Sequence, residues 1–61
     1  MMNKNFVIAT RWSDEMNARI KVIVGEFSEY NMARIFRDAY NKEYHADAEI
    51  VDERYLLSKL N

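Results

Sequence analysis

The absence of cysteine is the feature that most limits how this chain of 61 residues can fold. A domain of about 60 residues buries only about 60% of its unfolded surface, so small domains usually need a disulfide, a metal or a partner chain. Without cysteine there is no disulfide and no thiolate metal site, and the one histidine, His45, cannot build a zinc site alone. We therefore expect no cofactor and no metal. Since 49% of the residues are hydrophobic, we expect a second copy of the chain to cover part of them.

Charge is distributed unevenly along the chain, whose net charge is −1. Residues 1–42 carry seven Lys or Arg and five Asp or Glu, whereas residues 43–61 carry two and five. This asymmetry predicts a mildly basic body and an acidic tail. No stretch resembles a signal peptide, and none approaches the roughly 18 apolar residues of a membrane span. We expect no membrane partner and a location in the cytoplasm, or in the host cytoplasm for a viral protein.

Residues 5–12 predict a β-strand, because they are rich in β-branched and aromatic side chains. Successive side chains of a strand alternate between its two faces. The heavier and more apolar face consists of Phe6, Ile8, Thr10 and Trp12. The opposite face consists of Asn5, Val7, Ala9 and Arg11. We expect the first face, Trp12 included, to lie in the core and the second to point outward.

Two amphipathic helices are expected after the strand. Ser13 is a typical N-cap, and Asp14 and Glu15 suit the first turn of a helix. The apolar stripe of this first helix would consist of Met16, Ile20, Ile23, Val24 and Phe27. Gly25 either ends this helix or weakens it near its end.

The second helix is expected to begin at Ser28 or Asn31, which are both credible N-caps, and to run to about Tyr44. Its apolar stripe consists of Met32, Ile35, Phe36, Ala39 and Tyr40, and we expect it to lie in the core. Residues 45–61 form an acidic tail that could contain a short third helix, with Asp47 or Asp52 as its cap. A helix this short is marginal in isolation, so it must dock or stay mobile.

The order of a short strand and two helices resembles the ribbon-helix-helix family of DNA-binding proteins, to which Arc and MetJ belong. Arg11-Trp12-Ser13 resembles the Arg-Trp-Pro that ends the ribbon of Arc. Residues 31–39 resemble the family's Ser-x-Ser-Glu-Leu-Ile-Arg-Glu-Ala pattern. The resemblance implies a mostly α fold with one N-terminal strand, forming an intertwined homodimer around a two-stranded antiparallel ribbon. Residues 5–44 would be the dimerisation and DNA-binding domain, followed by the tail, residues 45–61.

The resemblance also implies a function: a sequence-specific transcriptional repressor that inserts its β-ribbon into the major groove of double-stranded DNA. The outward ribbon side chains that would read base edges are Asn5, Val7, Ala9 and Arg11. The backbone amides of Asn31 and Met32, at the start of the second helix, would hold a phosphate. Val7 and Ala9 depart from the family, whose readers are usually polar. They could contact thymine methyl groups, or they could equally be sheet residues covered by the tail or by a protein partner.

A second functional hypothesis rests on the charge and on the tail. The net charge of −1, the apolar Val7 and Ala9 and the apolar residues of the tail favour protein binding on the same fold. The chain would then be an antitoxin that neutralises a toxin through its C-terminal tail, or a small viral protein that inhibits a host protein. We expect no catalytic residues, because the sequence has no cysteine, no hydroxyl beside a histidine base and no glycine-rich phosphate loop.

Overall fold

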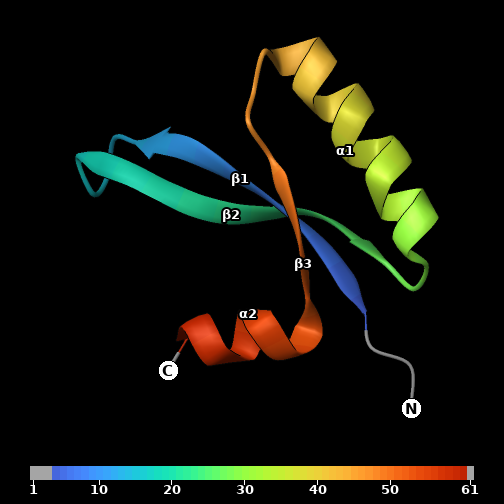
Figure 1. The fold of residues 1–61 in the computed structure, drawn as a ribbon. Coiled ribbons are helices and arrows are strands. Elements are labelled where there is room, and N and C mark those ends of the chain that lie inside the picture. The colour runs from blue at the N-terminus through green and yellow to red at the C-terminus, as the bar shows by residue number, and fades with distance from the viewer. Residues whose placement is uncertain (1–3, 61) are drawn as a thin grey trace.

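A computed structural model describes residues 4–60, with the side chains of Leu56, Lys59 and Leu60 left aside. The elements follow one another as β1 (Asn5–Ser13), β2 (Ala18–Phe27), α1 (Tyr30–Tyr44), β3 (Glu49–Asp52) and α2 (Glu53–Leu60). The strands form one antiparallel sheet in the order β2-β1-β3 (Figure 1). The expected fold, mostly α with a single strand in an intertwined ribbon-helix-helix dimer, is therefore wrong. A single chain completes its own sheet and packs α1 against it.

The largest error is β2, which occupies most of the segment expected to be the first helix. Its apolar residues fit a helical stripe, but Ile20, Val22 and Val24 also alternate with Arg19 and Lys21, as in a strand. β-Branched side chains lose rotamer freedom in a helix and pack well on a pleated sheet. Pairing with the whole of β1 therefore overrides the helical pattern.

A turn at residues 14–17 joins β1 to β2. Asn17 adopts the left-handed conformation, with φ of 52°, which asparagine tolerates better than most residues. The hydroxyl of Ser13 accepts a hydrogen bond from the Met16 amide at 3.2 Å. Ser13 thus accepts from the amide three residues later, as the expected helix N-cap would, but the segment that follows it is a hairpin turn and not a helix.

The expected second helix is confirmed as α1. It begins after Glu29, whose side chain makes no capping hydrogen bond, so neither Ser28 nor Asn31 is the N-cap. It ends at His45, which takes the left-handed conformation at φ of 51° and donates its backbone N–H to the Asn41 carbonyl. The helix packs on the sheet through Ala33, Phe36 and Tyr40.

The two faces of β1 are the reverse of those expected. Val7 and Ala9, expected to point outward, are 0% and 1% exposed and lie in the core under α1. Trp12, expected in the core, is 59% exposed. Ile8, on the same face as Trp12, is nevertheless buried. Val7, Ile8 and Ala9 of this central strand are all buried, so side chains on both of its faces are covered near its start. A run of consecutive apolar residues fits such a strand better than alternation does.

The C-terminal segment contributes a strand and a helix. β3 pairs with the first half of β1, from Asn5 opposite Asp52 to Ile8 opposite Glu49. The short helix α2 follows at once, and the Asp52 carboxylate accepts the Tyr55 amide at 2.7 Å. The expected helix is therefore present, with Asp52 and not Asp47 as its cap, whereas the strand was not expected.

The molecule is a thin slab whose Cα atoms extend over 38 × 31 × 12 Å. Its radius of gyration is 12.2 Å, against about 10.5 Å for a compact chain of this length. Helices α1 and α2 lie on opposite sides of the sheet, and the β1–β2 hairpin projects beyond α1 (Figure 1). Within residues 4–60, no helix is long and apolar enough to cross a membrane.

Candidate functional site

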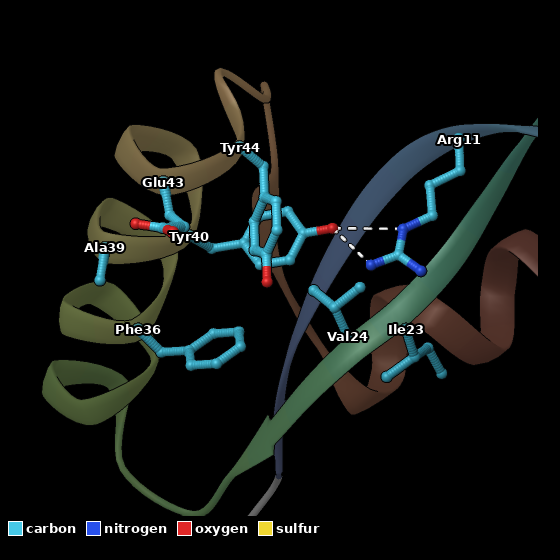
Figure 2. Close-up of a pocket in the computed structure, with 8 residues that line it drawn as sticks. All are labelled: Arg11, Ile23, Val24, Phe36, Ala39, Tyr40, Glu43 and Tyr44. Atoms are coloured by element: carbon cyan, nitrogen blue, oxygen red, sulfur yellow. Dashed lines mark hydrogen bonds between the residues drawn. The ribbon is translucent and has the colours of Figure 1, made fainter.

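A groove of about 630 Å³ lies between α1 and the projecting hairpin (Figure 2). The wall formed by α1 consists of Phe36, Ala39, Tyr40, Glu43 and Tyr44. The opposite side is formed by Arg11, Ile23 and Val24 of the two hairpin strands. The groove exists because α1 covers only the first part of β1 and leaves the far half of the hairpin bare on this side. It is open to solvent along its length.

A hydrogen-bonded arginine anchors the groove. The Arg11 guanidinium donates to the Tyr40 hydroxyl from Nη2 at 2.7 Å and from Nε at 3.2 Å (Figure 2). It also lies 6.0 Å from the centre of the Tyr40 ring. Tyr40 is 9% exposed, so the hydroxyl is held at the edge of the core while the guanidinium stays exposed. A guanidinium has five N–H donors, and Arg11 uses one from each of two nitrogens on Tyr40, so it retains further donors for a ligand in the groove.

Aromatic side chains run from the core to the groove mouth. Phe27 packs against Phe36 at a centroid distance of 5.2 Å, Phe36 against Tyr40 at 6.0 Å, and Tyr40 against Tyr44 at 4.8 Å. These separations lie in the favourable range for tilted aromatic pairs. The last ring, Tyr44, is 65% exposed. The series thus presents a rigidly supported aromatic surface to solvent.

An apolar ridge borders the groove on α1. It consists of Met32, Ile35 and Ala39, which follow one another at helical spacing. Met32 and Ile35 are 50% and 55% exposed. The expected apolar stripe of this helix is therefore only half buried: Phe36 and Tyr40 face the sheet, whereas the ridge faces solvent. The prediction that the whole stripe lies in the core is wrong.

The groove combines two charged side chains with an apolar lining. Arg11 and Glu43 are the charged residues of the groove, and the remaining lining is aromatic or aliphatic. Within the described part of the chain, no group of three or more His, Cys, Asp or Glu residues could hold a metal ion. What the groove offers is apolar area beside an arginine.

Of the four residues expected to read DNA, three are buried or half-buried. Asn5 is half-buried at the start of β1, and Val7 and Ala9 lie under α1, where their side chains have no access to a base. Arg11 alone of the four is exposed, and it is bound to Tyr40. The four do share one face of β1, as expected, but that face is the one covered by the helix.

The expected phosphate clamp lies at the other end of α1. Asn31 and Met32 are exposed in the first turn of the helix, whereas Arg11 faces its later turns around Tyr40. The structure therefore does not bring the clamp together with Arg11. Met32 contributes instead to the apolar ridge.

Sequence reasoning missed Tyr44 and Glu43 as site residues. The available signal was the spacing of Phe36, Tyr40 and Tyr44, three aromatic residues at intervals of four on one helix. The first two members, Phe36 and Tyr40, pack with the core, whereas the last, Tyr44, is exposed at the end of the helix.

The opposite face of the hairpin is a second exposed surface. Trp12 lies opposite Arg19, and Thr10 lies opposite Lys21, so these side chains share one face. The Trp12 indole N–H donates to the Asp14 carboxylate at 3.0 Å. Lys21 reaches Glu49 of β3 at 3.4 Å. This face is more polar than the groove, and it carries two cations.

Comparison with protein-family models, with curated proteins and with solved structures found no match.

Proposed function

We propose that this chain is a non-catalytic protein-interaction module that binds its partner through the groove and the adjoining ridge. The observation that carries the proposal is the joint exposure of Ile35, Met32 and Tyr44 beside the Arg11–Tyr40 pair. Tyrosine, methionine and arginine are enriched at the centres of protein interfaces. Hot spots there are large side chains in well-packed pockets. The groove supplies residues of these types on a single helix-and-strand frame.

The exposed apolar area gives the expected energetic scale. Burying a whole Met or Ile side chain contributes about 1.5–3 kcal/mol. Since Met32 and Ile35 are half exposed, covering each by a partner should contribute about 1 kcal/mol. Tyr44 is more exposed, and its ring is already held against Tyr40. Little rotamer freedom is therefore lost when a partner packs on it.

Site-specific photo-crosslinking in the native cell tests this proposal. A photoreactive amino acid in place of Ala39 faces the groove, while the same amino acid in place of Arg34 lies five residues away, on another side of α1. We expect a discrete crosslinked product from position 39 and none from position 34. Adding Tyr44→Ala to the position 39 variant should weaken that product. Equal labelling from both positions, or no product from position 39, would contradict the proposal.

A toxin or a host protein, the partners expected from the sequence, would fit this proposal. The partner would then contact the groove, and not the C-terminal tail as the sequence suggested. Residues 49–52 lie in the sheet, so removing the tail would also remove β3. We infer a cytoplasmic location from the cysteine-free sequence.

DNA binding through the hairpin is a second candidate function. The major groove admits a two-stranded antiparallel ribbon, and the hairpin face opposite α1 carries Arg19, Lys21 and Thr10. Each cation that contacts a phosphate should add about one unit to the slope of log K against log salt. Arg19→Ala should then lower both affinity and slope, while Arg34→Ala on α1 should change neither. No salt-sensitive binding at micromolar concentration would eliminate this candidate.

A further inference from the structure

The α1 side of the chain leaves large apolar side chains in solvent. Met32, Ile35 and Tyr44 are 50%, 55% and 65% exposed. A standard protein interface removes about 800 Å² from each partner. The slab measures 38 × 31 Å across its broad face, so this face is large enough for an interface of ordinary size.

The α1 side is the face best shaped to meet its own copy. The ridge residues Met32 and Ile35 lie in the first half of α1, whereas the groove is walled by its second half, around Tyr40 and Tyr44. If two α1 helices lie antiparallel, the ridge of each meets the groove of the other. A two-fold axis makes both contacts at once, as an isologous interface requires.

We propose that a second copy of this chain occupies the groove, forming a two-fold dimer in which antiparallel α1 helices cross close to Ala39. This inference rests on the proposed function and names its partner. Ala39 is exposed, and its small side chain lets helix axes approach to the short end of the usual 8–10 Å range. The groove carries one charge of each sign, Arg11 and Glu43. In a two-fold dimer, the charged groups of one copy can therefore approach groups of opposite charge on the other.

Pairing through the sheet edge is the weaker route to self-association. The outer edge of β2 carries Arg19 and Lys21, and a bulge interrupts its register with β1 beside Val7 and Ile8. Charged side chains and bulges are the devices that prevent edge-to-edge pairing. The α2 side, where Leu57 is 56% exposed, is the remaining rival and supplies a matched control.

Sedimentation equilibrium of the full chain at micromolar concentrations tests the dimer. Ile35→Asp and Leu57→Asp introduce the same charge at side chains that are 55% and 56% exposed in one chain. We expect a wild-type dimer, a dissociation constant raised at least ~100-fold by Ile35→Asp, and a change within about threefold for Leu57→Asp. Circular dichroism of both variants establishes that each keeps its fold.

Ala39→Cys gives a second readout, because the chain has no other cysteine. Near the two-fold axis, the two introduced thiols would fall within the roughly 7 Å Cα separation that a disulfide tolerates. Under mild oxidation we expect rapid formation of a covalent dimer by Ala39→Cys, and slow formation by Ser58→Cys on α2.

A monomeric wild type, or a dimer dissociated by Leu57→Asp and not by Ile35→Asp, would overturn the dimer. If the wild type is monomeric but position 39 still crosslinks to a different protein in cells, the interaction module stands with another partner. If position 39 crosslinks to nothing and the wild type is monomeric, both proposals fall.

Discussion

Replacing Gly25 by alanine probes how tightly β2 and α1 are packed. A Cβ atom built at Gly25 would lie 2.9 Å from Cε2 of Phe27 and 2.9 Å from Cε2 of Phe36. Both distances are shorter than van der Waals contact. Because Phe36 also packs on Tyr40 at 6.0 Å, moving its ring disturbs the next aromatic contact as well. Gly25 therefore marks a place where the helix approaches the sheet backbone closely.

The expected cost of Gly25→Ala follows from two opposing effects. Overpacking a filled core costs about 1–3 kcal/mol, and the reduced freedom of the unfolded chain returns about 0.4–1 kcal/mol. We expect a net loss of about 1–2 kcal/mol in the free energy of unfolding, out of a total of about 3–9 kcal/mol for a chain of this length.

Urea unfolding followed by circular dichroism measures this loss, and a double-mutant cycle tests its cause. Phe36→Leu replaces the ring that the new methyl group meets with a shorter side chain. Combined with Gly25→Ala, it should cost less than the two single losses added together, by about 1 kcal/mol. Additive losses, or a Gly25→Ala variant as stable as the wild type, would show that Phe36 does not confine this position.

Three smaller perturbations follow from single hydrogen-bonded groups. Tyr40→Phe removes the hydroxyl that accepts from Arg11 and should lower the free energy of unfolding by about 1 kcal/mol, measured in urea, whereas Arg11→Lys, which can keep one bond, should lose less. Asn41→Ala removes the side-chain amide that bonds the Ala48 backbone at 2.7 and 3.3 Å. It should lower the free energy of unfolding by about 1–3 kcal/mol in the same assay. A loss well below about 1 kcal/mol would mean that water replaces the amide. Asp52→Ala removes the cap of α2 and should cost about 1 kcal/mol, with reduced helical ellipticity, whereas Asp52→Asn should retain most of it.

The sequence was sufficient for the parts of the fold that depend on local patterns. The strand at residues 5–12 and the helix ending at Tyr44 are both present as β1 and α1. The Asp52 cap was one of two stated alternatives. For β1 and α1 the local pattern had one reading, whereas for the cap of α2 it left two candidates, Asp47 and Asp52.

The remaining errors come from contacts between distant segments. Residues 18–27 fit both a helical stripe and strand alternation, and only pairing along β1 decides for the strand. The four-residue β3 has no stability of its own and forms because β1 offers it a free edge. Helix α1 covers the face of β1 that carries Val7, whereas Trp12 lies on the other face and beyond the residues that pair with β3, so the expected roles of the two are reversed.

The candidate site follows the same division. Arg11 was predicted to point outward and is exposed, but its hydrogen-bond partner Tyr40 is 29 positions further along the chain. No local pattern links the two. The groove is a product of how far α1 reaches over the hairpin, and that reach is set by packing.

The hydrogen bond from the Glu53 amide to the Lys4 carbonyl, at 2.9 Å, has a consequence for the order in which the chain must assemble. It closes the pairing of β1 with β3, two strands separated by most of the sequence. Closing so long a loop costs entropy before its contacts form, so we expect the hairpin and α1 to organise first and the pairing of β1 with β3 to form last. A circular permutant could join the two ends of the chain and open it at the turn of residues 14–17. In that permutant β1 would follow α2, so its pairing with β3 would become local and its pairing with β2 would become remote. The same native contacts would then be reached by the opposite route.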